Sequence, residues 1–82
     1  MTEPSSIAVD REVDARGLNC PLPILRAKKM LAEMQSGQIV RVLATDPGSV
    51  KDFQAFSRQT GNELIGQGET SDKAYEFFLK RK

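Results

Sequence analysis

The sequence predicts an α+β fold, a two-layer α/β sandwich in which two helices cover one face of a four-stranded mixed sheet. Two observations support this prediction. The apolar residues change their spacing along the chain, alternating in some segments and recurring every three or four residues in others, in the order β-α-β-α-β-β. Each helical segment has one apolar stripe and one polar side, so both helices are expected to pack against the sheet. The order of the strands within the sheet does not follow from these patterns.

The composition limits the chain to one small globular domain. Its 82 residues have room for a single core, and an apolar fraction of 39% is too high for a disordered chain. We expect residues 1–5 to form a flexible N-terminal tail and residues 6–82 to form the domain. A net charge of +1 favours neither strong nucleic-acid binding nor a membrane. Because the sequence has no apolar run near the length of a membrane span and no signal-peptide pattern, the expected compartment is the cytoplasm.

The first strand is expected within residues 6–14. Four residues at alternate positions form one largely apolar face of it: Ile7, Val9, Arg11 and Val13. The first helix is expected to begin at Pro21 and to end at Gly37, as about 15 residues or roughly 22 Å of helix. Its apolar stripe consists of Ile24, Ala27, Leu31 and Met34, widened by Leu25 and Ala32.

The second half of the chain begins with a β-branched strand over residues 38–44. A second helix follows, with either Asp46 before Pro47 as its N-cap or a capping box of Ser49 and Asp52. The core residues of this helix are Val50, Phe53 and Phe56, and Gly61 ends it.

The C-terminal part is predicted to contain a short strand over residues 62–67 and a final segment over residues 73–80. Gly66 is expected to form a bulge or a weak point in the short strand. The final segment fits a strand through Tyr75, Phe77 and Leu79, and it also fits a helical stripe through Ala74, Phe77 and Phe78. Its aromatic content favours the strand. If one face of the sheet is uncovered, an exposed Phe78 would indicate a partner surface.

The inventory of reactive side chains excludes several classes of site. The chain has one cysteine and no histidine, so it can form neither an internal disulfide nor a Cys/His zinc site. It also lacks the base of a Cys-His or Ser-His catalytic arrangement. We therefore expect no metal and no cofactor, and any chemistry must depend on one sulfur, carboxylates, cations and backbone groups.

That one cysteine, Cys20, stands at the start of the first helix. Pro21 and Pro23 fit the first turn of a helix, where their missing N–H groups cost little, so Cys20 is expected to be the N-cap or its neighbour. Gly17 permits a tight or left-handed turn before it, and Asn19 can stabilise that turn through local hydrogen bonds. The helix dipole, the unpaired N–H groups and, to a small extent, Arg16 favour the thiolate, which is the nucleophilic form.

The strength of this effect leaves an alternative open. A dipole contribution of about 0.3–1 kcal/mol lowers a thiol pKa only slightly, which is too little to attack an unactivated substrate without a base. It is sufficient for exchange with a partner that brings activated sulfur. The alternative is that Cys20 is a small buried hydrophobic residue without chemical function.

A resemblance to a known family favours the functional interpretation. Residues 14–23, DARGLNCPLP, resemble the D-x-x-G-x-x-C-P-x-P core of the TusA/SirA family of sulfur-carrier proteins. Residues 45–49, TDPGS, resemble the second recognisable segment of that family. Chain length, element order and motif positions agree as well, so the resemblance covers about residues 7–82.

The resemblance implies a fold similar to the C-terminal domain of a bacterial translation initiation factor, with a strand as its last segment. It also implies a sulfurtransferase or sulfur carrier with a covalent persulfide intermediate. Cys20 would accept sulfur from a cysteine desulfurase or another persulfide donor and relay it to an acceptor protein. Asp46 would help partner docking. The known routes of the family are 2-thiouridine formation in tRNA, molybdenum-cofactor supply and sulfur oxidation, and the sequence does not select among them.

The charged surface has two interpretations. Arg26, Lys28 and Lys29 could form a docking face for an acidic partner, or they could be an ordinary solvated side of the helix. Two other functions compete with the sulfur carrier: a non-catalytic regulatory or RNA-binding module, and a thiol redox sensor. Nothing in the sequence requires more than a monomer.

Overall fold

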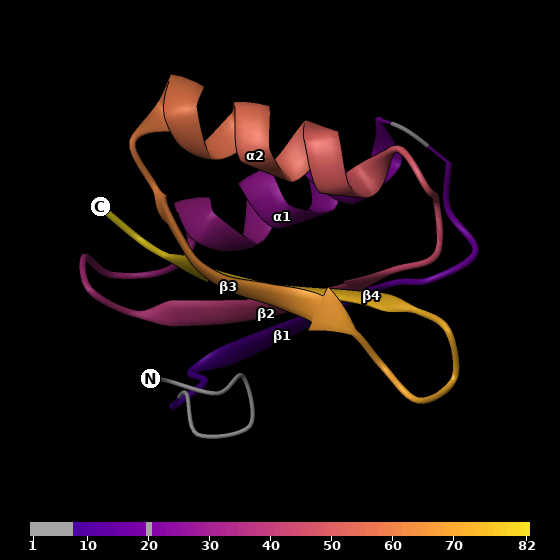
Figure 1. Cartoon of the computed structure of the whole chain (residues 1–82). Coiled ribbons are helices and arrows are strands. Elements are labelled where there is room, and N and C mark those ends of the chain that lie inside the picture. The colour runs from indigo at the N-terminus through magenta and orange to yellow at the C-terminus, as the bar shows by residue number, and fades with distance from the viewer. Residues whose placement is uncertain (1–7, 20) are drawn as a thin grey trace.

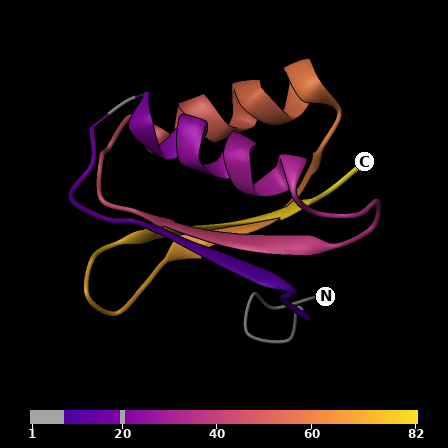
Figure 2. The ribbon, with the colours of Figure 1, turned by 180° about the vertical axis from the view of Figure 1, so that it is seen from behind.

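The computed structural model describes residues 8–19 and 21–82, which form two layers (Figure 1). The six elements, in chain order, are β1 (Arg11–Ala15), α1 (Leu22–Ala32), β2 (Ile39–Ala44), α2 (Ser49–Thr60), β3 (Glu63–Glu69) and β4 (Tyr75–Lys80). The predicted element order is confirmed, and the final segment is a strand. Both helices lie on the same face of the sheet, as the view from behind also shows (Figure 2). The proposed tail over residues 1–5 and the alternating position Ile7 lie outside the described residues.

The four strands form one mixed sheet in the order β1-β2-β4-β3. β1 pairs with β2 in parallel, whereas β4 pairs antiparallel with both β2 and β3. The edges of the described sheet are therefore β1 and β3. The register of β3 with β4 shifts between Leu64 and Gly66, which confirms the irregularity predicted at Gly66.

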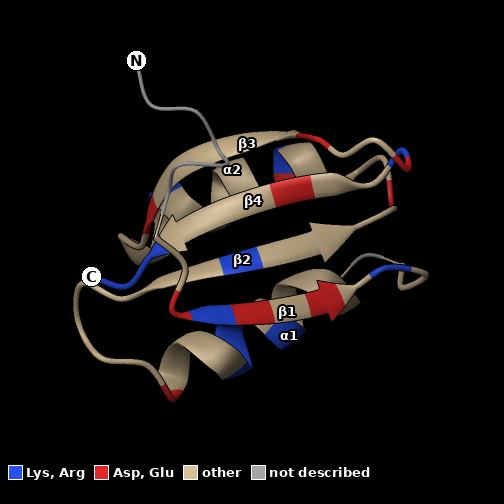
Figure 3. Ribbon diagram, turned by 90° about the horizontal axis from the view of Figure 1, so that it is seen from below, with Lys and Arg blue, Asp and Glu red and all other residues tan. Residues whose placement is uncertain are grey.

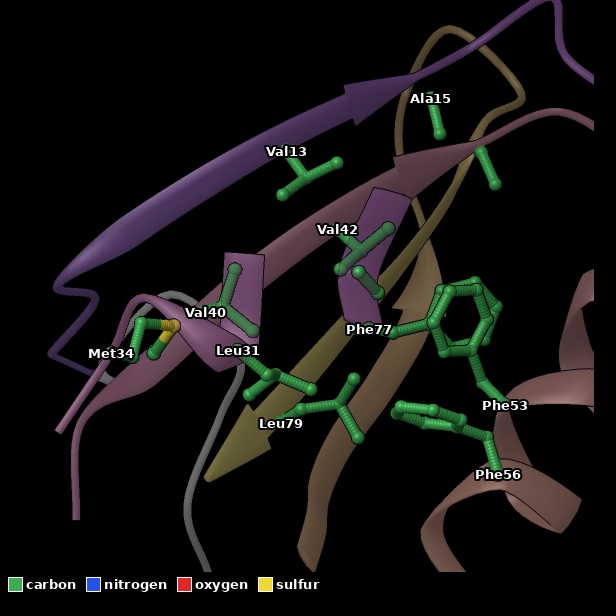
Figure 4. Close-up of a cluster of buried hydrophobic side chains, with 12 residues drawn as sticks. Val13, Ala15, Leu31, Met34, Val40, Val42, Phe53, Phe56, Phe77 and Leu79 are labelled. Atoms are coloured by element: carbon green, nitrogen blue, oxygen red, sulfur yellow. The ribbon is translucent and has the colours of Figure 1, made fainter. Parts of the chain in front are cut away.

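The core lies between the helices and the sheet (Figure 4). Phe53 of α2 is fully buried and stacks on Phe77 of β4, with ring centroids 4.5 Å apart. Phe56 meets Phe53 edge-on at 6.3 Å. Val50 is partly buried and packs against the same cluster, so the stripe predicted for the second helix is confirmed.

The opposite face of the sheet does not offer the aromatic patch that an exposed Phe78 would have made. Phe78 is only 2% exposed. By strand alternation it shares this face with Arg41, its register partner on β2. Arg41 is held across the face by ion pairs of 2.8 Å with Glu12 and 2.9 Å with Glu76. Among the described residues, Phe78 therefore does not form the exposed aromatic surface that was considered for it.

The first strand is shorter and later than its pattern predicts. β1 begins only at Arg11, which is exposed, and Val9 precedes the strand with 40% of its surface exposed. Val13 and Ala15 are the buried residues of β1. The strand continues to Ala15 because it pairs with β2 in parallel up to Ala44, an interaction that local alternation does not reveal.

The first helix is also shorter than predicted. α1 ends at Ala32, and Glu33 caps it through its backbone N–H to the carbonyls of Met30 and Leu31. Gly37 has the left-handed φ of +89° but lies in the turn that leads into β2, where its N–H donates to Arg81 O at 2.8 Å.

The apolar stripe of α1 is narrower than predicted as well. Ala27, Leu31 and Met34 are buried and Ile24 packs against the core, as expected. Leu25 and Ala32 do not widen this stripe, because both are exposed. Pro23 is buried and Met30 packs against the core instead, so α1 meets the core through residues that the predicted stripe did not include.

The start of the second helix differs from both capping schemes. The N-cap of α2 is Gly48, without a side-chain hydrogen bond, so neither Asp46 nor Ser49 caps it. Asp46 forms the preceding turn instead: its Oδ1 accepts from Gly48 N–H at 3.3 Å and its carbonyl accepts from Ser49 N–H at 3.0 Å. Gly61 ends α2 with φ +82°, as predicted.

Candidate functional site

Two loops meet at one end of the sheet. β1 and β2 run in parallel with Ala15 opposite Ala44, so the loops that follow these strands leave the sheet side by side. α1 and α2 both begin at this end (Figure 1). The Gly17 N–H donates to Thr45 Oγ1 at 2.9 Å, which ties the first loop to the second. The segment before Cys20 and the turn that contains Asp46 are therefore neighbours.

The turn that precedes Cys20 has the geometry that the sequence predicts. Gly17 has φ +80°, the left-handed conformation that glycine tolerates best. Leu18 N–H donates to Ala15 O at 3.3 Å, which closes a tight turn. Asn19 contributes through its main chain, because its carbonyl accepts from Leu22 N–H at 2.8 Å. Cys20 itself lies outside the described residues.

The first turn of α1 is built around the two prolines. Pro21 is the N-cap, with φ −99° and ψ 19°, and Pro23 occupies the second helical position and is buried. Cys20 is therefore the neighbour of the N-cap, one of the two positions expected for it. Pro21 and Asn19 are both exposed, so the residues on either side of the cysteine face solvent.

The supply of backbone donors at this helix start is smaller than predicted. Leu22 N–H is already bonded to Asn19 O, and Pro23 has no N–H group. The described residues add neither a side-chain cap nor an acidic residue in the first turn. Within the described residues, the helix dipole is therefore the main electrostatic effect that favours a negative charge at the N-terminal end of α1.

An ion-pair network holds the loop between β1 and α1. Arg16 binds both carboxylate oxygens of Asp14 at 2.9 Å and reaches Asp72, in the β3–β4 turn, at 3.4 Å. The hydrogen bonds from the Arg16 side chain and backbone lower the pKa of Asp14 to about 2. The pKa of Asp72 is lowered too, chiefly by the Thr70 hydroxyl. Since these carboxylates compensate Arg16, its expected small contribution to the Cys20 thiolate is weaker still.

The three cations suggested as a docking face have different surroundings. Arg26 lines a groove between α1 and β1, together with Lys29. Lys28 is exposed on α1 but does not line that groove. Leu22 and Leu25, which are not among the predicted site residues, are 46% and 52% exposed beside the same groove. Their spacing of three is visible in the sequence, but the predicted helical stripe places Leu25 in the core.

The chain is similar to known proteins over most of its length. The family model described as Sulfurtransferase TusA matches residues 11–81. A protein named sulfur carrier protein TusA from Allochromatium vinosum is 62% identical over 72 residues, which are 88% of this chain and 93% of that protein. Another of that name, from Pseudomonas entomophila, is 37% identical and covers 89% of this chain and 90% of its own length.

A solved structure matches the fold. The crystal structure of a SirA-like protein from Desulfitobacterium hafniense superimposes with a TM-score of 0.78 and 30% sequence identity. The match covers 87% of this chain and 96% of that protein. Within residues 8–19 and 21–82, no helix is long and apolar enough to cross a membrane.

Proposed function

The chain belongs to the TusA family of sulfur carriers, and we propose that Cys20 is the residue on which it carries sulfur. The observation that best supports this role is the helix start beside Cys20, with Pro21 at the N-cap and Pro23 in the first turn. The exposed residues Asn19 and Pro21 leave room for a partner protein to approach this part of the chain.

Loading consists of one displacement at sulfur. The Cys20 thiolate attacks the terminal sulfur of a partner's cysteine persulfide and forms a new S–S bond. The original S–S bond of the partner breaks, and its cysteine leaves as a thiolate. A thiol with a pKa near ambient pH is an efficient attacking group in such exchange, so a strongly lowered pKa is not required.

Unloading repeats the displacement in the opposite sense. A thiolate of the acceptor protein attacks the terminal sulfur of the Cys20 persulfide, and Cys20 leaves as a thiolate. No electrons are gained or lost overall in either step. Because the chain has one cysteine, no second thiol of its own can attack the persulfide and release the sulfur as sulfide.

A carrier role requires a donor and an acceptor. We propose a cysteine desulfurase as the donor and a cysteine-bearing protein as the acceptor, with the cytoplasm as the compartment, because a free thiol persists best where disulfides are kept reduced. Arg26 and Lys28 are proposed to attract acidic partner surfaces, and Asp46 is proposed to support docking beside the loop of Gly17. The acceptor pathway is open among tRNA thiolation, molybdenum-cofactor supply and sulfur oxidation.

Intact-mass spectrometry after incubation with a cysteine desulfurase and L-cysteine tests the role of Cys20. We expect a mass gain of one sulfur atom that a reductant reverses. Cys20→Ser should gain nothing and should keep the thermal stability of the parent within about 1 kcal/mol. A serine variant that still gains sulfur would refute the assignment. Failure of the parent to gain sulfur while iodoacetamide still alkylates its thiol would instead indicate the wrong sulfur donor or a redox role.

The docking residues need a separate measurement. Arg26→Glu and Lys28→Glu should each slow loading by the desulfurase at low ionic strength, and the difference from the parent should shrink as salt screens the charges. Equal loading rates at low salt would show that these cations belong to an ordinary solvated surface.

A further inference from the structure

A groove of about 590 Å³ runs between α1 and the edge strand β1. One wall is the side of α1 that begins at Leu22, together with the C-cap residue Glu33, and the other is β1 from Glu12 to Asp14. The groove begins at Leu22, two residues after Cys20, so one of its ends lies at the helix start already described. Figure 3 shows the basic residues of α1 next to the acidic residues of β1.

The β1 wall can pair with another strand. In the described sheet β1 has a neighbour on one side only, so alternate backbone N–H and C=O groups face outward. Its register with β2 is continuous from Arg11 to Ala15. The other edge strand, β3, contains the irregularity at Leu64 and Gly66, and such bulges disfavour added strands. Of the two edges, β1 is thus the better template.

The two walls have matching lengths. Five strand residues span about 16 Å at about 3.3 Å each. The 11 residues of α1 span about 16 Å at about 1.5 Å each. An extended segment of five to seven residues therefore fits beside β1 while its alternate side chains contact α1 over the whole groove.

The charges of the groove are unequally compensated. Two of its three carboxylates are already paired, Glu12 with Arg41 at 2.8 Å and Asp14 with Arg16 at 2.9 Å, which leaves Glu33 as the one groove carboxylate without an ion pair within the described residues. Arg26 and Lys29, in contrast, take part in no ion pair within the described residues. The groove consequently favours an occupant that directs acidic side chains toward α1.

The exposed apolar surface of the groove favours an occupant that also has apolar side chains. Leu22 and Leu25 expose about half of their surface there. An occupant that places apolar side chains between the acidic ones would cover both leucines, which gives a favourable contribution in proportion to the apolar area removed from water.

A second copy of this chain does not meet these requirements. If β1 paired antiparallel with its own copy about Val13, Glu12 of each chain would lie opposite Asp14 of the other. An in-register parallel pair would place each carboxylate opposite its equivalent. Like charges directly opposite one another destabilise strand pairing, so a different chain is the better occupant.

We propose that the groove receives an extended, cysteine-bearing segment of the protein that exchanges sulfur with Cys20, bound as a fifth strand beside β1. Its apolar and acidic side chains face α1, and its cysteine lies at the Leu22 end. The proposal rests on the carrier role of Cys20. Strand pairing would raise the local concentration of the partner's sulfur next to Cys20.

A synthetic peptide tests this proposal. The probe has the order threonine, leucine, lysine, glutamate, lysine, leucine and threonine, which places leucine and glutamate on one face. A cysteine at either end carries an aromatic thiol in a mixed disulfide. Cys20 attacks the sulfur of the peptide cysteine, a new S–S bond forms, and the coloured aromatic thiolate leaves, so the rate is followed by absorbance.

Only one of the two cysteine positions brings the disulfide to the Leu22 end of the groove. The probe with that cysteine position should react about tenfold faster than a peptide that has the same cysteine position but lysine and glutamate exchanged. N-methylation of the amides that would pair with β1 should abolish this advantage. Lys29→Glu should reverse the preference between the two peptides, whereas Lys51→Glu, which changes an exposed lysine of α2, should leave it intact. Equal rates for all peptides would overturn the proposal.

A second measurement does not depend on the reactivity of Cys20. In the Cys20→Ser variant, the cysteine-free probe should shift the NMR signals of the β1 amides more than those of β3. No shift at β1 would also overturn the proposal. If the parent gains sulfur from the desulfurase while the peptides give neither effect, the groove proposal is wrong and the carrier role stands. If β1 responds but the desulfurase loads no sulfur, the groove binds extended segments and the proposed loading of Cys20 by this donor is wrong.

Discussion

The Thr45 hydroxyl accepts a hydrogen bond of 2.9 Å from the backbone N–H of Gly17, and this contact joins two segments 28 residues apart. Gly17 belongs to the loop that leads to Cys20, and Thr45 directly precedes Asp46. The two parts of the sequence that carry the family resemblance are thus linked by one side chain. The link depends on the parallel register that places Ala15 opposite Ala44.

Thr45→Val removes this acceptor at nearly constant side-chain volume. Because the contact is exposed, the expected loss of unfolding free energy is small, about 0.5 kcal/mol. The sulfur-loading rate should fall by a larger factor than the stability change alone predicts, because the loop before Cys20 loses the hydrogen bond that holds it to Thr45. Urea denaturation measures the change in stability and loading kinetics measure the change in rate. Thr45→Ser keeps the hydroxyl and should retain the stability and the loading rate of the parent. Serine and valine variants with the same loading rate would show that the contact does not position the loop.

Gly17→Ala tests the left-handed turn without a steric clash. A Cβ at Gly17 would meet no atom within 4 Å, so any cost comes from its φ of +80°. We expect a loss of about 1–2 kcal/mol in unfolding free energy. Gly68→Ala is the matched control, because a Cβ there also meets nothing within 4 Å and no positive φ is involved. Equal stabilities of the two variants would contradict the strain argument.

The fold was predictable to the extent that it depends on local periodicity. Alternation and helical stripes gave the correct element order, and Gly61 was identified correctly as the end of α2. The helix boundaries were less predictable because several residues compete for each cap. Gly37 and Asp46 both have suitable chemistry, but the chain uses them in the adjoining turns, where it must change direction to rejoin the sheet.

The site was predictable only along the chain. The sequence places Cys20 next to Pro21, but the helix begins at Leu22, one residue later than predicted, with Pro21 as its N-cap. The contact between Gly17 and Thr45 requires the parallel pairing of β1 with β2, which no local pattern reveals. The exposure of Leu25 was missed because a helix stripe can face either the core or a groove, and only the placement of α1 over the edge strand decides between them.

The ion pair of Asp14 predicts a pH dependence of stability. Hydrogen bonds from Arg16 lower the pKa of Asp14 from 3.8 to about 2 in the folded chain. The ionised form is therefore favoured by folding, so its contribution is complete above about pH 4 and is lost as the pH falls toward 2. Urea denaturation across this range should show a weaker acid-induced loss for Asp14→Asn than for the parent. NMR titration of the carboxyl should give a midpoint well below 3.8, and a midpoint near 3.8 would contradict the pairing.

A buried hydroxyl at the start of α2 gives the last prediction. Ser49 is 1% exposed, and its Oγ has no hydrogen-bond partner within the described residues. A buried hydroxyl without a partner costs about 1–3 kcal/mol relative to water, whereas an apolar group in its place costs nothing of this kind. Ser49→Ala should therefore raise the unfolding free energy by about 1 kcal/mol, measured by urea denaturation.

Ser57→Ala is the control with the opposite sign, since the Ser57 hydroxyl donates to Asn62 O at 2.6 Å and accepts from Leu64 N–H at 3.1 Å. Its removal should lower stability by about 1–2 kcal/mol. A loss of stability in both variants would mean that the Ser49 hydroxyl has a partner in solution.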